Sequence, residues 1–172
     1  MGTAAAADPA AWAALRAGGH AALVRHANAP GTGDPPGFRV DDCATQRNLD
    51  DRGRAEAAEM GAAFRREGVA IAELRSSRWC RARDTARLMG LGDVTDEPAL
   101  DSFFASRDEE PGRTAALRRY LSGLGGRTVV LVTHQVNITA LTGLFPRSGE
   151  VIVVRAPTGG GVEVIGRIAP PD

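Results

Sequence analysis

The stretch TVVLVTH, residues 128–134, is the clearest strand in the chain. Its first five residues are all β-branched or apolar, which is typical of a parallel strand that is buried on both faces. The run ends in Thr133 and His134, at the carboxyl end of the predicted strand. Ligands in open α/β sheets bind beyond the carboxyl ends of the strands, so His134 is a candidate site residue.

Two further segments repeat this pattern. In HAALVRH, residues 20–26, four apolar residues lead directly into Arg25 and His26. A third predicted strand, near residues 70–76, leads into the arginine-rich turn SSRWCR at 76–81. We expect these strand ends to meet at one edge of a sheet, which would bring two of the chain's three histidines together with several arginines.

The rest of the chain alternates helices with strands. Aspartates at 8 and 50 are predicted helix N-caps, and glycines at 18 and 68 end the same helices. Further helices are predicted near 79–89, 111–125 and 136–144, with a hairpin over 150–156 and 162–168 and irregular structure over 98–104. Residues 27–48 are rich in Pro, Gly and Asp, which predicts a long loop.

This order of elements predicts an α/β fold, a three-layer α/β/α arrangement around a central, mostly parallel sheet. We expect residues 1–18 to form a tail and a leading helix, and residues 19–168 to form one domain. The chain has 172 residues, 43% of them hydrophobic, and that is enough for one domain with a substantial core.

The charge pattern excludes some classes of partner and favours another. A net charge of zero is not typical of a protein that binds nucleic acid or a membrane surface, and no apolar run is long enough to span a membrane. All 21 basic residues are arginine, whose forked guanidinium matches carboxylate or phosphate oxygens. Together with the cluster of arginines and histidines at the strand ends, this leads us to expect a phosphorylated small molecule as the partner. The sequence predicts no oligomeric state.

Arginines and histidines in this pattern suit phosphoryl transfer. A neutral imidazole is a competent nucleophile and can form a phosphohistidine. Neighbouring arginines lower the pKa of a histidine and keep it neutral, and the helix predicted after His134 adds backbone N–H groups that favour an anion. The chain has no usual metal-ligand spacing, and we expect neither a metal nor another cofactor.

Four motifs resemble those of the histidine phosphatase superfamily, which has the phosphoglycerate-mutase-like fold. They are LVRHA at 23–27, LDDRGRAEA at 49–57, the set Ser77, Arg81, Ala82, Thr85 and Ala86, and VVLVTH at 129–134. Ala27 replaces the family's usual Gly, and Asp50 replaces its Thr. The chain looks closest to short bacterial phosphatases, including the lipopolysaccharide-core heptose phosphate phosphatase-like group.

The resemblance implies a metal-independent phosphomonoesterase and a set of roles. His26 would be the nucleophile, Arg25, Arg81 and His134 would bind the phosphoryl group, and the backbone of Gln135 would lie beside it. For the acid that protonates the leaving oxygen we favour Asp101, with Glu109 and Glu110 as fallback and Asp108 behind them. From the long loop, Arg39 is the residue that we expect to contact the substrate.

Other functions remain open at this point. A phosphohistidine protein phosphatase would use the same residues on a protein partner, and a non-catalytic phosphate-binding module could retain the same fold. A phosphomutase is less favoured, since the short segment between Arg81 and His134 leaves little room for a cap.

The two cysteines bear on localisation. Cys43 lies in the long loop and Cys80 is adjacent to Arg81, so a disulfide between them would tie the loop to the predicted active-site turn. Residues 1–7 (MGTAAAA) do not look like the start of a packed domain and would suit a segment that follows a removed signal peptide. We therefore expect an exported or periplasmic protein with this disulfide, rather than a cytoplasmic one with two free thiols.

Overall fold

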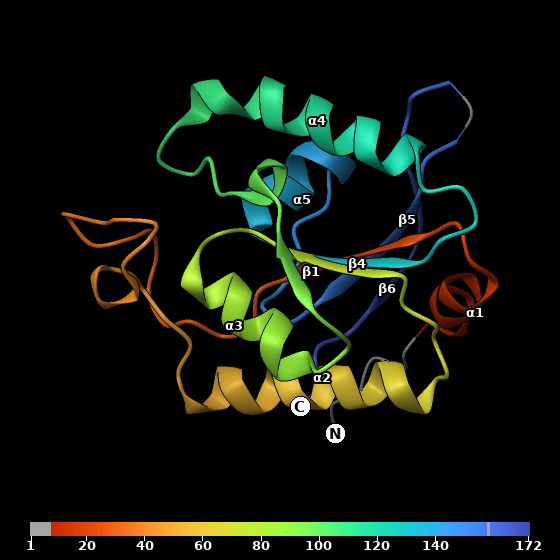
Figure 1. The fold of residues 1–172 in the computed structure, drawn as a ribbon, viewed down its shortest axis with the longest axis horizontal. Coiled ribbons are helices and arrows are strands. Elements are labelled where there is room, and N and C mark those ends of the chain that lie inside the picture. Colours follow the sequence, from red (N-terminus) through yellow and green to blue (C-terminus); the bar gives the residue numbers. More distant parts are fainter. Residues whose placement is uncertain (1–7, 158) are drawn as a thin grey trace.

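A six-stranded sheet forms the centre of the molecule (Figure 1). The computed structural model describes residues 8–157 and 159–172, so the segment that we expect to follow a signal peptide lies outside the described residues. The strands are β1 (Ala21–Arg25), β2 (Glu73–Ser76), β3 (Val94–Asp96), β4 (Val129–Thr133), β5 (Val151–Arg155) and β6 (Glu163–Ile168). Their order in the sheet is β3-β2-β4-β1-β5-β6. The pairings among β3, β2, β4 and β1 are parallel. Strand β5 pairs antiparallel with both β1 and β6, so it alone of the six runs in the opposite direction, which confirms the mostly parallel sheet.

The register of the parallel strands aligns their carboxyl ends. Arg25 at the end of β1 pairs with Thr133 at the end of β4, and Ser76 at the end of β2 pairs with Val132 of β4. The residues that follow these three strands therefore leave the sheet at one edge, as the sequence predicted.

Within the described residues, five helices cover the sheet in two layers (Figure 1). Helices α1 (Pro9–Ala17), α2 (Asp51–Arg66) and α3 (Cys80–Met89) pack on one face, and α4 (Glu110–Ser122) and α5 (Gln135–Thr142) pack on the other. Strand β4 contributes to both cores, since Val130 and Val132 point to the first face and Val129 and Leu131 to the second. The three-layer α/β/α arrangement is confirmed.

The leading helix is part of the first core. Asp8 caps α1 by accepting a hydrogen bond from the backbone N–H of Ala10. Trp12 of α1 packs edge-on against Phe64 of α2, with 5.1 Å between the ring centroids. A buried aromatic pair therefore holds α1 to α2, in the core on this face of the sheet.

One glycine has a packing role that bears on the site. Gly53 lies in the first turn of α2, and a Cβ added there would lie 2.0 Å from the carbonyl oxygen of Asn28. Only glycine lets the helix approach the backbone so closely. The N-terminus of α2, capped by Asp50, is thus packed directly against the turn that follows His26.

The structure adds elements that the sequence pattern did not predict. Strand β3 is three residues long and mostly exposed, so it has no readable periodicity and forms by parallel pairing with β2. Short 3-10 turns occur over Cys43–Thr45, Pro98–Leu100 and Arg107–Glu109.

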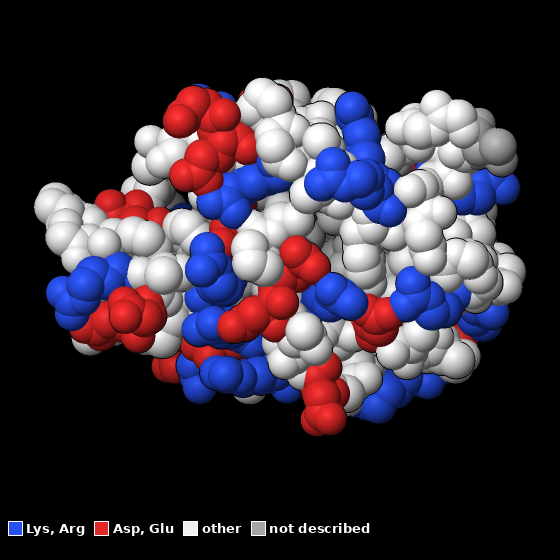
Figure 2. Space-filling view, turned by 45° about the horizontal axis from the view of Figure 1, so that its top comes forward, with Lys and Arg blue, Asp and Glu red and all other residues white. Residues whose placement is uncertain are grey.

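No helix in the described part of the chain is long and apolar enough to cross a membrane. Figure 2 shows acidic and basic side chains interspersed over one face.

Candidate active site

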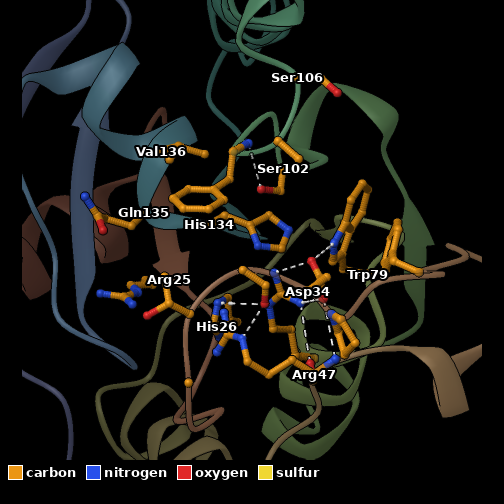
Figure 3. Close-up of a pocket in the computed structure, with 18 of the residues that line it drawn as sticks. Arg25, His26, Asp34, Arg47, Trp79, Ser102, Ser106, His134, Gln135 and Val136 are labelled. Atoms are coloured by element: carbon orange, nitrogen blue, oxygen red, sulfur yellow. Dashed lines mark hydrogen bonds and ion pairs between the residues drawn. The ribbon is translucent and has the colours of Figure 1, made fainter.

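A cavity of about 460 Å³ lies where the carboxyl ends of β1 and β4 meet the start of α3 (Figure 3). Its walls come from these strand ends, from the loop 27–48, from the segment 102–113 and from the start of α5. The polar and aromatic side chains among its lining residues include Arg25, His26, Asp34, Phe38, Arg47, Trp79, Arg81, Ser102, Phe104, Ser106, Glu109, Arg113, His134 and Gln135.

His26 is buried at the bottom of this cavity and held in one orientation. Its Nδ1 lies 2.8 Å from the carbonyl oxygen of Ala27. A carbonyl only accepts, so Nδ1 carries the proton, and the lone pair of Nε2 accepts a hydrogen bond from Nε of Arg81. Burial, followed by the positive charge of Arg81, lowers the pKa of His26 to about 3. The imidazole is therefore neutral near pH 7, with Nε2 available as a nucleophile.

Arg81 lies directly beside that nitrogen. Its Nε is 3.3 Å from Nε2 of His26, and its side chain is almost fully buried in the first turn of α3. Thr85, one turn further along α3, accepts a hydrogen bond from the N–H of Ala27 and donates one to the carbonyl oxygen of Arg81. The backbone that follows the nucleophile and the backbone of its arginine neighbour are thus joined through one hydroxyl.

His134 faces His26 from the end of β4, with 5.4 Å between the ring centroids. Its Nε2 lies 2.8 Å from the hydroxyl of Ser77. Its Nδ1 is buried and has no hydrogen-bond partner among the described residues. Burial, followed by the proximity of His26, lowers the pKa of His134 well below its usual value.

Two more arginines raise the positive charge of the cavity. Arg25 donates from Nη1 to the carbonyl oxygen of Pro146 (2.8 Å), and Arg47 donates from Nε to the carbonyl oxygen of Gly33 (2.7 Å). Burial and then the charge of Arg81 lower the pKa of both guanidinium groups. Three cations close enough to disfavour one another make the cavity a site for an anion.

The structure does not place Asp101 in the cavity. Its side chain is fully buried behind the lining residues, where one oxygen accepts from the backbone N–H of Arg78 (2.8 Å) and the other from Nε of Arg78 (2.7 Å). The resemblance favoured Asp101 as the acid because it follows Pro98-Ala99-Leu100, but its buried carboxylate is paired with Arg78 and also contacts Ser77 and Arg113. Of the three fallback acids, Glu109 lines the cavity, and Asp108 and Glu110 do not.

The expectation for Arg39 also needs correction, whereas that for Gln135 agrees with the geometry. Arg39 is exposed, forms an ion pair with Asp42 and does not line the cavity. Its position on the outer part of the loop turns it toward solvent. Gln135, the first residue of α5, does line the cavity.

Asp34 and Arg47 reach the cavity from the loop 27–48. The sequence favoured Arg39 over Arg47 among the residues of this loop and gave no indication of Asp34. Asp34 accepts from Nη1 of Arg81 (2.7 Å) and from Nε1 of Trp79 (3.0 Å). Figure 3 shows Asp34 beside Trp79 and close to Arg47. The length of the loop was the sole signal in the sequence, and it does not say which loop residues turn inward.

The loop is fastened to the start of α3 by several contacts. Cys43 and Cys80 form a disulfide, as the sequence suggested. Gln46 accepts from the N–H of Cys80 through its side-chain oxygen (2.9 Å), and the ring of Phe38 stacks on Trp79 with 5.0 Å between centroids. These contacts fix the wall of the cavity that carries Asp34.

Ala27, where the resembling motif has Gly, fits without strain. No described residue other than glycine has a positive φ, so the turn after His26 uses ordinary backbone geometry. The methyl group of Ala27 is fully buried and packs with Ala29, Leu49 and Ala57. The methyl group therefore serves as part of a small apolar cluster.

Within residues 8–157 and 159–172, no three His, Cys, Asp or Glu side chains gather closely enough to hold a metal ion. The histidines at the site instead have a carbonyl, a hydroxyl and an arginine as neighbours.

Comparisons with known proteins rest on the fold. No protein-family model matches the chain, and no curated protein matches it. Among solved structures, the protein histidine phosphatase SixA complexed with tungstate is 17% identical and superposes with a TM-score of 0.65 over 87% of this chain and 96% of that one. TTHB049 from Thermus thermophilus is 22% identical, with a TM-score of 0.63 over 87% and 99% of the two chains. A phosphoserine phosphatase from Entamoeba histolytica in complex with phosphoserine is 14% identical, with a TM-score of 0.60 over 87% and 96%. The chain therefore has the phosphoglycerate-mutase-like fold of solved histidine phosphatases.

Proposed function

We propose that the protein is a metal-independent phosphomonoesterase that acts through a phosphohistidine on His26. The observation that carries this proposal is the pairing of a buried, neutral imidazole with a buried guanidinium, 3.3 Å apart, in an arginine-lined cavity. The imidazole supplies the nucleophile, and the guanidinium supplies charge for a phosphoryl group. We infer a small phosphorylated metabolite or sugar phosphate as the substrate, because the cavity is small.

The reaction has two halves. Nε2 of His26 attacks phosphorus, the ester P–O bond breaks, and a carboxylic acid protonates the departing oxygen. Water then attacks the phosphohistidine, the P–N bond breaks and phosphate leaves. Arg25, Arg81 and His134 hold the phosphoryl oxygens in both halves, and the backbone N–H of Gln135 adds a donor at the start of α5.

Two unpartnered nitrogens support this assignment. Nδ1 of His134 and Nε of Arg25 are buried without a hydrogen-bond partner among the described residues, although both side chains line the cavity. A buried polar group left without a partner costs about 1–3 kcal/mol. Hydrogen bonds to phosphoryl oxygens would offset that cost. The tungstate in the SixA complex and the phosphoserine in the Entamoeba complex are ligands of the same anionic kind.

The test is hydrolysis of 4-nitrophenyl phosphate by the wild type, by His26→Ala and by a control, His20→Ala. His20 lies ahead of β1 and contacts the carbonyl oxygen of Gly18, so its loss should leave turnover unchanged. Loss of the nucleophile should reduce kcat by about 10³-fold or more. Rapid acid quenching with labelled substrate should trap a phosphohistidine in the wild type and none in His26→Ala. Near-normal turnover by His26→Ala would contradict the proposal.

The likeness to SixA keeps a phosphohistidine protein phosphatase as the second candidate. A panel of sugar phosphates and phosphohistidine peptides separates the two: we expect the higher kcat/KM on the sugar phosphates. A chain that binds phosphate but hydrolyses nothing in either panel would instead be a non-catalytic module.

We also propose that the protein is exported to an oxidising compartment. The support is the Cys43–Cys80 disulfide, since such bonds persist mainly outside the cytosol. Peptide mapping without reductant, on protein isolated from its native compartment, should recover the two cysteines in one linked peptide pair. Two free thiols there would contradict this proposal.

A further inference from the structure

The proposed reaction needs an acid for the leaving oxygen, and Asp101 is not in the cavity. Two carboxylates are among the cavity-lining residues, Asp34 and Glu109. They lie in different segments, Asp34 in the loop 27–48 and Glu109 just before α4. Their surroundings decide between them.

Asp34 lies one guanidinium away from the nucleophile. Its Oδ1 is 2.7 Å from Nη1 of Arg81 and its Oδ2 is 3.3 Å from Nη2. Nε of the same guanidinium is 3.3 Å from Nε2 of His26. Asp34 and His26 therefore contact opposite ends of the group that is expected to bind the phosphoryl oxygens.

The loop fixes the Asp34 carboxylate while leaving it open to the cavity. Arg47 braces the loop by donating to the carbonyl oxygens of Gly33 and Ala29, and Nε1 of Trp79 holds Oδ2. The Asp34 side chain is 17% exposed. Catalytic groups need this combination of a supported position and access to the substrate.

Glu109 lacks both properties. Its side chain is 43% exposed and forms an ion pair with Arg113 of α4. It makes no hydrogen bond to His26, Arg81 or His134. A solvated carboxylate at the rim is a poorer proton donor than one held beside the phosphoryl site.

We propose that Asp34 is the general acid and base of the phosphoryl transfer, an inference that rests on the proposed function. An incoming phosphate monoester takes over the N–H groups of Arg81, and Asp34, released from that ion pair beside a new anion, takes up a proton from solvent. As the bond from Nε2 of His26 to phosphorus forms and the ester P–O bond breaks, the Asp34 proton passes to the leaving oxygen. In the second half, water attacks phosphorus, its proton returns to the Asp34 carboxylate and the P–N bond breaks.

The charge environment supports this exchange. Burial acts to raise the pKa of Asp34, but hydrogen bonding and charge from Arg81, together with the Trp79 N–H, lower it overall. When a phosphate group binds Arg81, the arginine shares its charge and its N–H groups with the substrate, so it lowers the pKa of Asp34 less. Burial continues to raise that pKa. Substrate binding thereby prepares the acid.

The experiment compares leaving groups. Wild type, Asp34→Asn, Glu109→Gln and a same-loop control, Asp41→Asn, are assayed on 4-nitrophenyl phosphate and on glycerol phosphate. An alkoxide leaves poorly without a proton, whereas nitrophenolate leaves well. Loss of a general acid should lower kcat/KM by about 10²–10³-fold on glycerol phosphate and by less than about tenfold on the aryl ester. Asp41 is exposed and does not line the cavity, so its variant should match wild type on both.

Other outcomes overturn the proposal. An equal loss on both esters would mean that Asp34 only positions Arg81, and a leaving-group-dependent loss in Glu109→Gln alone would give the role to Glu109. Asp34→Glu retains a carboxylic acid and should recover part of the activity on glycerol phosphate. If this variant unfolds at the same temperature as wild type but recovers activity on neither ester, the acid role is contradicted. If Asp34→Asn fails to fold, the comparison of Asp34→Glu with wild type on the two esters decides whether Asp34 is the acid. A wild type that traps no phosphohistidine would instead refute the proposed function itself.

Discussion

The two walls of the cavity are built in different ways. On one wall, the strand wall, Arg25 ends β1, and His26 and His134 directly follow the buried strands β1 and β4, which have neighbouring strands on both sides. Asp34 and Arg47 instead come from a loop without strands of its own, held by a disulfide and by side-chain hydrogen bonds. The strand wall carries the groups proposed for phosphoryl transfer, and the loop wall carries the group proposed to act on the leaving alcohol.

This difference indicates where the protein can change. The strand wall is part of the sheet, so a shift of His26 would disturb β1 and β4 as well. The loop wall can take new residues at little cost to the core, and binding residues commonly lie on such loops over a rigid scaffold. We therefore expect substrate preference to depend on the loop 27–48 and the segment 102–113.

Removing the disulfide tests how far the loop wall depends on its covalent attachment. The bond joins residues 37 positions apart, and closing a loop of that length is worth about 4 kcal/mol in the chain-entropy model. Cys43→Ser/Cys80→Ser should lose about this much free energy of unfolding, measured by urea denaturation at pH 7. Reductant should destabilise wild type and leave the double variant unchanged. A loss below about 1 kcal/mol would show that hydrogen bonds alone hold the loop.

The pH dependence of stability tests the strand wall. The pKa of His26 is lowered from 6.5 to about 3 in the folded protein. As pH falls below 6.5, the unfolded chain binds a proton that the folded chain refuses, so the free energy of unfolding falls until about pH 3. Between about pH 5.5 and 4 this single histidine contributes a slope of about 1.4 kcal/mol per pH unit.

His26→Asn should therefore show a shallower dependence than wild type over that interval, by about one proton. Urea denaturation in phosphate-free buffers at a series of pH values measures it. His134→Asn should shift the slope in the same direction, because the pKa of His134 is also lowered. If the free energy of unfolding has the same pH dependence in wild type and in His26→Asn, His26 is protonated in the folded protein as readily as in the unfolded chain, and the prediction fails.

A pair of arginines separates the inner from the outer part of the loop wall. Arg47 lines the cavity and braces the loop, whereas Arg39 is exposed and paired with Asp42. Arg47→Ala should raise KM by about tenfold or more, since hydrogen bonds from a charged group are worth about 1.5–3 kcal/mol. Arg39→Ala should change kcat/KM by less than about twofold, because Arg39 is exposed and does not line the cavity. Steady-state kinetics on one aryl phosphate measures both, and the reverse order would restore Arg39 as the substrate contact.

The contrast between the two walls also explains what the sequence could predict. Apolar runs that end in polar residues identify buried strands and the edge where they end, and this was enough to bring Arg25, His26, Arg81 and His134 together. Strand β3 has three mostly exposed residues and forms by pairing with β2, so no hydrophobic pattern in the sequence predicts it. Asp34 depends on distant partners, Arg81 and Trp79, which loop composition does not indicate. The position of Asp101 in the chain did not reveal that its side chain turns to Arg78.

The close approach of Gly53 to Asn28 limits how this protein can be redesigned. Even a methyl group at residue 53 would lie 2.0 Å from a backbone oxygen two residues beyond His26. The helix α2 therefore cannot slide or tilt independently of the turn after the nucleophile. A new loop grafted between residues 29 and 47 would leave this contact between α2 and the turn unchanged, and with it the position of His26. A change at the start of α2, by contrast, would displace the turn that it contacts and therefore His26.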